Sequence, residues 1–436
     1  MSNESLFIRE WGEIHKSEKN NQDKIDNIDK IELNSNAFKE LEKFAESDNK
    51  ENRFLKFKKS DVLKVQNFVG VITTKDGTQI EILPKISEEN DADKSRETLT
   101  KMLKVVHKLP FIQTTEADLQ LKNQPLPEVL IAWFLGCVDK IIKQGIRRDY
   151  LRIEGYEKFL KGQLQTHKQL NEPPHKQHLF HIEYDVLSPN RPENRLIHSA
   201  LLQVLKWSKY FDNQKRAKHF LNFLADVPIS QNIKNDFDTW SNGRDMNYYK
   251  DVLPWLKLIL NQQSPFTLKD KNAGISFLLP MEVLFERYVA KILAKDLPSE
   301  WILSEQKPQK SLACFTNEEN PKGKGVFKMK PDIVISDKLK ETIYILDTKW
   351  KLIDEKQTYE SGNIDHKKGI QQSDMYQLFA YGKKYDVPKV ILIYPQWAKF
   401  ENEFSFKLDE GLDLCVKPFA LDNDKMTNFK ALITTL

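Results

Sequence analysis

Two short apolar runs that lie close together, each rich in β-branched residues, limit most strongly what this chain can fold into. The runs are residues 333–335 and 343–346, and the polar segment 336–341 between them is typical of a hairpin turn. Asp332 precedes the first run and Asp347 follows the second. Because the end of one antiparallel strand lies beside the start of its partner, the two carboxylates are expected to converge at one edge of a sheet.

Lys349 lies two residues after Asp347 and is expected to point to the same side of the strand, because side chains alternate with a period of two. Two carboxylates and an amine suit phosphodiester hydrolysis. Asp332 and Asp347, with the carbonyl of Thr348, would hold Mg²⁺, which lowers the pKa of a bound water. Lys349 would orient that water or stabilise the developing charge. The alternative is a strand that ends in solvated charges, since the same Asp-x-Lys spacing recurs in loop-like sequence at 354–356.

Two helices are expected beside this hairpin. The apolar periodicity of 281–293 predicts an amphipathic helix that carries Glu286, which would either lie in solvent or reach the metal. The spacing of 373–385 predicts a second helix, with Gln377 and Tyr381 four residues apart on one face. That face would either support the metal site or only pack against the sheet.

The sequence pattern changes twice along the chain, whose 436 residues suffice for two or three domains. Residues 1–125 alternate strand-like runs with charged loops and predict a β-rich amino-terminal domain, with a hairpin at Asp76-Gly77. Residues 126–265 are expected to be a helical region. Residues 266–436 predict an α/β domain with a mixed sheet flanked by helices, so the expected class is α+β and multidomain.

Two other stretches are candidates for binding. Arg147 and Arg148 are adjacent and close to Tyr150, and such a cluster either holds a phosphate or a partner's carboxylate, or is simply solvated. The charged segment 350–372 would form a flap or a loop that contacts DNA.

Composition restricts the class of protein and its compartment. The net charge of +4 is small for this length and neither requires nor excludes nucleic acid. Three well-separated cysteines without a Cys-x-x-Cys pair argue against a disulfide framework or a structural zinc and favour the cytoplasm. No secretory signal is visible, and the most apolar run, 129–138, is too short to span a bilayer.

The order of these motifs resembles that of the PD-(D/E)xK nuclease superfamily: Pro331-Asp332, then Asp347-Thr348-Lys349, then Gln377 and Tyr381. Over residues 65–400 the chain also resembles the McrC family, the nuclease subunits of McrBC modification-dependent restriction systems. Outside the nuclease motifs this resemblance is carried by residues 80–85, 145–150, 160–162, 193–195 and 284–289.

The resemblance implies a Mg²⁺-dependent DNA endonuclease. The implied roles are metal binding by Asp332 and Asp347, catalytic assistance by Lys349, and support of the site by Gln377, Tyr381 and the first-helix acid Glu286.

The resemblance also implies a partner, an McrB-type AAA+ GTPase hexamer that recognises double-stranded DNA containing methylcytosine. This chain would contact the ring through its amino-terminal region and stimulate GTP hydrolysis, with Arg147 and Arg148 as candidates on chemical grounds. The chain has no Gly-x-x-x-x-Gly-Lys-Ser/Thr phosphate loop, so the GTP is expected to be bound by the partner. The competing hypotheses are a catalytically silent adaptor of the motor and a nuclease that acts alone.

Overall fold

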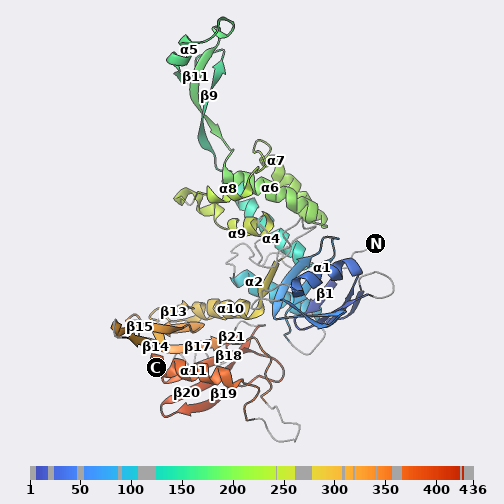
Figure 1. Cartoon of the computed structure of the whole chain (residues 1–436), viewed down its shortest axis with the longest axis vertical. Helices are drawn as coiled ribbons and strands as arrows, with labels where there is room; N and C mark the ends of the chain where they lie inside the picture. The colour runs from blue at the N-terminus through green and yellow to red at the C-terminus, as the bar shows by residue number, and fades with distance from the viewer. Residues whose placement is uncertain are drawn as a thin grey trace. The chain divides into compact units, whose positions relative to one another are not determined.

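The structure is a computed structural model (Figure 1). The residues that it describes are 6–17, 24–46, 54–86, 91–106, 124–241, 243–260, 277–306, 310–317, 320–339, 341–355, 366–422 and 425–426. They are a mixture of helices and strands, which confirms the α+β class. None of the helices found among them is both long and apolar enough to cross a membrane. The middle of the predicted flap, 356–365, lies outside the described residues.

The chain divides into two compact units. The first unit joins Met1–Asn123 to Leu278–Leu436, and the second is Gln124–Phe277. The amino-terminal strands and the carboxy-terminal sheet therefore belong to one unit. The predicted division into three domains, at residues 125 and 265, stays a prediction.

The amino-terminal part of the first unit is built from strands, as its alternating pattern predicts. One sheet has the order β1-β8-β7-β12, and its strands are β1 (Leu6–Arg9), β7 (Phe68–Thr73), β8 (Gln79–Leu83) and β12 (Phe277–Pro280). The other has the order β3-β4-β2-β6-β5, with β2 (Glu13–Lys16), β3 (Lys24–Asn27), β4 (Lys30–Leu33), β5 (Leu55–Lys59) and β6 (Val62–Val65). Helix α1 (Ser35–Glu46) packs against β2 and β5, and helix α2 (Ala92–Val106) packs against β8. The predicted turn at Asp76-Gly77 joins β7 to β8, and Gly77 has the positive φ of 87° that such a turn favours.

The carboxy-terminal part of the first unit is a mixed sheet in the order β13-β16-β17-β18-β20-β19, with β21 paired to β20. Its strands are β13 (Ile302–Glu305), β16 (Ile333–Ser336), β17 (Thr342–Thr348), β18 (Lys389–Pro395), β19 (Phe404–Asp409), β20 (Leu412–Ala420) and β21 (Lys425–Met426). A separate hairpin is formed by β14 (Lys310–Asn317) and β15 (Asn320–Met329). The pair β16–β17 is antiparallel and β17–β18 is parallel, so β17 is a central strand that is paired on both sides.

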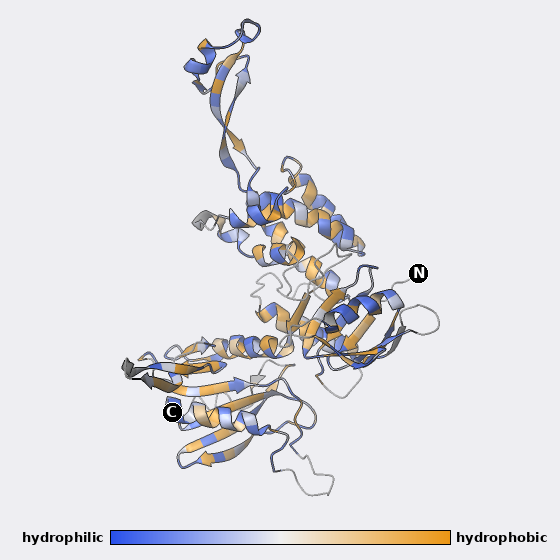
Figure 2. Ribbon diagram, in the orientation of Figure 1, coloured by the Kyte–Doolittle hydropathy of each residue, from blue (hydrophilic) through white to orange (hydrophobic). Residues whose placement is uncertain are grey.

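Helices α10 (Met281–Asp296) and α11 (Gln372–Tyr385) both pack against this sheet. The central strands are strongly apolar, and the helices have one polar face (Figure 2). Ile345 of β17 is buried with Leu378 and Tyr381 of α11 and with Val390 of β18. This packing fixes α11 over the strand that carries Asp347.

The second unit contains helices and a long β-hairpin. The helices are α4 (Leu126–Gln144), α6 (Pro192–Trp207), α7 (Phe211–Phe223), α8 (Ile233–Asp238), α9 (Leu253–Leu260) and the 3₁₀ helix η2 (Arg244–Tyr249). The hairpin, called the arm below, spans residues 149–188 and projects from these helices (Figure 1). It comprises β9 (Asp149–Glu157), β10 (Gln163–Leu164), α5 (Thr166–Leu170), η1 (Pro174–Lys176) and β11 (Phe180–Ser188).

The prediction of a helical region is right for most of the second unit and wrong for the arm. Most side chains of β9 and β11 are exposed or half-buried, so neither face of the arm is a core face. The strand pattern is nevertheless present in β11, where Phe180, Ile182 and Tyr184 alternate with charged or polar neighbours, and the expectation of a helical region overlooked it.

Candidate active site

The end of β17 and the residue before β16 meet at one edge of the carboxy-terminal sheet. Ile333 pairs with Leu346 in the antiparallel ladder, so Asp332 lies beside the last residues of β17. Asp332 Oδ2 accepts hydrogen bonds from the backbone N–H and the side-chain hydroxyl of Thr348, both at 2.8 Å. Antiparallel pairing thus brings together Asp332 and Thr348, which are 16 residues apart in the sequence.

Asp347 is buried in a way that costs free energy unless something binds it. Its side chain is 1% exposed, Oδ1 has no hydrogen-bond partner, and Oδ2 lies 2.6 Å from Nζ of Lys349. Burial raises the pKa of Asp347 above its usual range, and the nearby charge of Asp332 raises it further. A buried carboxylate with an unpartnered oxygen is suited to bind a cation.

Lys349 lies next to the Asp347 carboxylate and is partly exposed to solvent. Its burial alone would lower the pKa of the ammonium group, but the Asp347 carboxylate outweighs this effect and the net shift is upward. Its backbone N–H donates to the carbonyl oxygen of Ile393 in β18, at 2.9 Å, which continues the sheet pairing past the end of β17. Lys349 is therefore held as a cation beside Asp347.

Glu286 of α10 also reaches the site rather than solvent. It is buried, and its Oε2 accepts a hydrogen bond of 2.7 Å from Nε2 of Gln306. Burial, followed by the charge of Asp332, raises the pKa of Glu286 to about 7. Gln306 also donates its backbone N–H to the carbonyl oxygen of Asp332, at 3.0 Å, and has a positive φ of 45°. No signal in the sequence marks Gln306, which comes directly after β13.

Gln377 and Tyr381 share one face of α11, as their spacing predicts. Gln377 Nε2 donates to the hydroxyl oxygen of Tyr381 at 2.8 Å. The pKa of the Tyr381 hydroxyl is raised, chiefly by burial and also by the charges of Asp347 and Asp332, against the opposing effect of Gln377. The pair therefore lies within electrostatic reach of the carboxylates.

The oxygen atoms of the site can be compared with those that a divalent cation needs. Among the described His, Cys, Asp and Glu side chains, no group of three or more is placed to hold a metal ion. Mg²⁺ commonly binds through one or two carboxylates and keeps several waters, so it does not need such a cage. The unpartnered oxygen of Asp347 beside Asp332 fits that requirement, with the carbonyl of Thr348 as the further donor.

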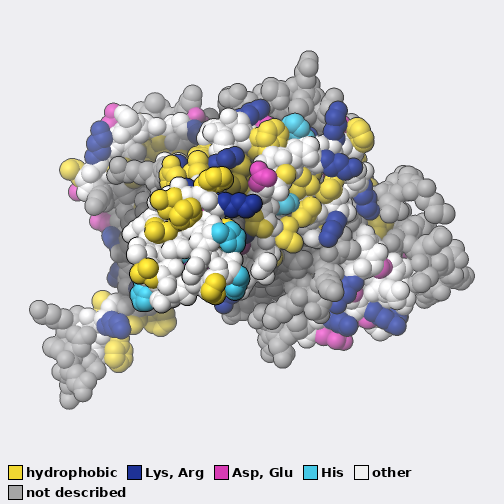
Figure 3. Space-filling view, turned by 90° about the horizontal axis from the view of Figure 1, so that it is seen from above, with side chains coloured by type: hydrophobic (Ala, Val, Ile, Leu, Met, Phe, Trp, Pro, Cys, Tyr) yellow, Lys and Arg dark blue, Asp and Glu magenta, His cyan; other side chains and the backbone are white. Residues whose placement is uncertain are grey.

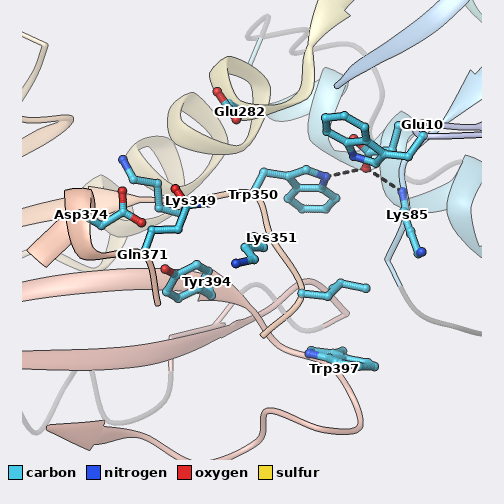
Figure 4. A pocket seen from close by; sticks show the side chains of 12 residues that line it. Glu10, Lys85, Glu282, Lys349, Trp350, Lys351, Gln371, Asp374, Tyr394 and Trp397 are labelled. Carbon is cyan, nitrogen blue, oxygen red and sulfur yellow. Dashed lines mark hydrogen bonds between the residues drawn. The ribbon is translucent and has the colours of Figure 1, made fainter. Parts of the chain in front are cut away.

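A cavity of about 570 Å³ adjoins the candidate site. Lys349 and Asp374, the latter in the first turn of α11, lie at one end of it, and Glu10 and Lys85 lie at the other (Figure 4). Trp350 lies between the two ends. No pattern in the sequence marks Asp374, Glu10 or Trp350 as residues near the site.

Glu10 is the most deeply buried acid of this cavity, with 1% of its surface exposed. Oε1 accepts hydrogen bonds from the indole Nε1 of Trp350 and from the backbone N–H of Lys85, whereas Oε2 is buried without a partner. Burial raises the pKa of Glu10 from 4.5 to about 7, although both hydrogen bonds oppose the shift.

We expect this raised pKa to make the stability of the chain depend on pH. An acid whose pKa is raised by folding stabilises the folded state at low pH and loses that contribution as pH rises through its folded value. Compared with Glu10→Gln, the wild type should lose about 3 kcal/mol of stability between pH 4.5 and pH 8. Thermal melts of both chains across this range measure the difference, with the exposed Glu410→Gln as the charge-matched control. A difference between Glu10→Gln and wild type that does not change with pH would contradict the assignment.

Arg147 and Arg148 are not among the residues that the structure gathers at the carboxylates. They belong to the second unit, immediately before the arm, and their side chains are exposed. The backbone N–H of Arg147 donates to the hydroxyl oxygen of Tyr249, and its carbonyl oxygen accepts from Nδ2 of Asn194. Asn194 is itself fully buried, so the 193–195 motif fixes the base of the arm.

Comparisons with known proteins found one family model and solved structures of similar fold. Residues 63–395 match the family model described as McrBC 5-methylcytosine restriction system component. A chain in the half-complex from a tetradecameric assembly of Thermococcus gammatolerans McrB AAA+ hexamers with bound McrC has a similar fold, with a TM-score of 0.68 and 18% identity over 96% of this chain and 95% of that one. A chain of the cryo-EM structure of the Thermococcus gammatolerans McrBC complex gives a TM-score of 0.50 and 18% identity, over 68% of this chain and 89% of that one. No curated protein matches the sequence.

Proposed function

This chain belongs to the family of McrBC 5-methylcytosine restriction system components, and we propose that it is the Mg²⁺-dependent DNA endonuclease subunit of such a system. The observation that carries the proposal is the buried Asp347 carboxylate, paired with Lys349 and set beside Asp332. In the superfamily that the motifs resemble, two carboxylates and a lysine of this kind form the nuclease site.

Asp332, Asp347 and the carbonyl of Thr348 would hold the metal. Bound there, Mg²⁺ would supply a Lewis acid and a water of lowered pKa. Thr348 donates two hydrogen bonds to one oxygen of Asp332, which fixes the orientation of that carboxylate. The rigid placement of charged groups is the main source of catalysis in phosphoryl chemistry.

Lys349 would act on the phosphate. Its ammonium group stays charged because Asp347 lies 2.6 Å away, and it is only partly buried, so a phosphodiester can approach it. Beside the carboxylates it would orient a water or stabilise the charge that develops on a phosphoryl oxygen. Glu286, held by Gln306 near Asp332, adds an acid that can exchange a proton near neutral pH.

We further propose that the chain works with an AAA+ GTPase of the McrB type, and that their complex acts on double-stranded DNA that contains modified cytosine.

The tip of the arm is the surface proposed to contact this partner, because it exposes large apolar side chains to water. Phe159 and Leu170 are each 81% exposed, and Leu160 is also largely exposed. The view from above in Figure 3 shows apolar side chains interspersed with Lys, Arg and His. Such surfaces mark interaction sites. Contact through the amino-terminal region, and stimulation of GTP hydrolysis by Arg147 and Arg148, stay predictions.

The test is cleavage by Lys349→Ala in the presence of the partner, GTP and Mg²⁺. We expect the cleavage rate to fall by about 10²–10³, because the cation beside the reacting phosphate is lost. The matched control is Lys407→Ala, which removes an exposed lysine of the same sheet. GTP turnover measured in the same reactions should stay at the wild-type rate in both variants.

Three outcomes would contradict this proposal. Wild-type cleavage by Lys349→Ala would remove the catalytic assignment. GTPase stimulation by a wild-type chain that never cuts DNA would favour the silent adaptor. Cleavage by the isolated chain would favour a nuclease that acts alone.

A further inference from the structure

A carboxylate directly after the first strand of the chain contacts the segment that carries Lys349, 340 residues away in sequence. Oε1 of Glu10 accepts a hydrogen bond of 2.5 Å from the indole Nε1 of Trp350. Trp350 is the residue directly after Lys349, and its side chain is buried. Figure 4 shows the indole pointing toward Glu10, away from the end of the cavity that holds Lys349 and Asp374.

Glu10 is held firmly on its own side of this contact. Its backbone N–H donates to the carbonyl oxygen of Leu83 at 2.9 Å, which extends the parallel pairing of β1 with β8. The same Oε1 that binds Trp350 also accepts the backbone N–H of Lys85 at 2.8 Å. The carboxylate therefore has one position, set by the amino-terminal sheet.

Trp350 in turn packs against α10, the helix that carries Glu286. Its ring centroid lies 5.2 Å from that of Phe285, the residue before Glu286 in α10. The hydrogen bond from the indole to Glu10 thus fixes an aromatic ring that contacts α10 and lies two residues beyond the end of β17. Movement of this ring would displace Lys349 and Asp347, because the backbone between them is short.

A second connection joins the same sheet to α10. Strand β12 belongs to the amino-terminal sheet and runs directly into α10, and the N–H of Met281 donates to the carbonyl oxygen of Asn67 at 3.1 Å. The amino-terminal sheet therefore holds both elements that carry the acids Glu286 and Asp347.

We propose that Glu10 is a positioning residue of the nuclease site, which it acts on through Trp350, and that the site is correctly assembled only when the amino-terminal sheet is in place. This inference rests on the proposed nuclease function. It makes the amino-terminal sheet a part of the cutting machinery, since a displacement of about 1 Å at reacting groups can cost about 10²-fold in rate.

The experiment compares Glu10→Ala, Glu10→Gln and Trp350→Phe in the full chain, assembled with the partner and GTP. Glu10→Ala and Trp350→Phe each break the hydrogen bond, and we expect kcat for cleavage to fall by about 10-fold to 10²-fold while KM for DNA changes less than about twofold. Glutamine keeps an oxygen for both donors, so Glu10→Gln should retain most of the rate. The double variant Glu10→Ala/Trp350→Phe should be no slower than the slower single variant, because both remove one interaction. Trp301→Phe is the control, since Trp301 packs on Tyr344 at the other end of β17.

A readout that needs neither metal nor activity separates positioning from general destabilisation. Amide hydrogen exchange of the peptide 345–352 should be faster in Glu10→Ala and Trp350→Phe than in wild type, and unchanged in Trp301→Phe. Trp350→Phe keeps the packed ring, so it carries the test if Glu10→Ala fails to fold. Wild-type kcat in Trp350→Phe, or unchanged exchange in 345–352, would overturn the proposal. A wild-type chain that does not cut DNA would refute the nuclease function, whereas the exchange measurement would still decide whether Glu10 positions the segment.

Discussion

Asp347→Asn should abolish DNA cleavage, lowering the rate by about 10³ or more, while the partner's GTP hydrolysis continues. The substitution keeps the shape of the side chain and removes its charge. Asp347 is the buried carboxylate with an unpartnered oxygen, and Lys349 lies against its other oxygen. The variant therefore loses both the anion that would bind the metal and the charge that holds the lysine.

The stability of this variant gives an independent check. A buried carboxylate without full hydrogen bonding costs free energy, so we expect Asp347→Asn to melt no lower than wild type. The control is Asp413→Asn, which neutralises an exposed aspartate of β20 in the same sheet and should leave cleavage unchanged. Loss of cleavage together with a lowered melting temperature would point to misfolding instead of lost chemistry.

The double variant Phe159→Ser/Leu170→Ser should separate the chain from its GTPase partner. Both side chains are 81% exposed at the tip of the arm, so replacing them removes no packing from the core of the unit. Apolar anchors at an interface commonly contribute about 2 kcal/mol or more, which corresponds to about 30-fold weaker binding. Analytical ultracentrifugation of the mixed proteins measures the loss, and both GTPase stimulation and cleavage should fall with it.

Phe211→Ser is the matched control for the arm. Phe211 is also largely exposed and lies in the same unit, at the start of α7, but outside the arm. Binding should be unchanged in this variant. Equal losses in both variants would show that exposed apolar residues of this unit act on solubility, and would remove the arm from the interface.

Local patterns predicted the part of the site that is contiguous in sequence. The apolar runs on either side of 336–341 fold as the antiparallel pair β16–β17, so Asp332 reaches the end of β17. The periodicity of 281–293 and 373–385 predicted helices that form as α10 and α11. Binary patterns of this kind succeed because one face of each element is buried against the sheet.

Long-range contacts and elements without a buried face could not be predicted in this way. Glu10 and Trp350 meet only because the two ends of the chain fold into one unit, and nothing within either short segment indicates the other. Gln306, the residue directly after β13, donates a hydrogen bond to Glu286. A glutamine at the end of a strand is common, so the sequence does not mark it as part of the site. The arm was missed although β11 alternates apolar with polar residues, because the apolar helices on either side of it led to the expectation of a continuous helical region.

The position of a family motif in the structure also shows whether its residues hold the fold together or lie at the candidate site. Asn194 is buried at the base of the arm, where it binds the backbone of Arg147 and the hydroxyl of Tyr249. Resemblance alone does not tell whether such a residue acts on a substrate or on the fold. Here its contacts assign it to the fold of the second unit.

The most direct test of the central claim is a single reaction that measures both activities of the complex. Wild type and Asp347→Asn, each assembled with the partner, are given GTP, Mg²⁺ and double-stranded DNA with methylated cytosine, and the cut ends and released phosphate are counted together. We predict that both complexes hydrolyse GTP at the same rate and that only the wild type cuts DNA. Cleavage by the Asp347→Asn complex at the wild-type rate would contradict the assignment of the nuclease site to this chain.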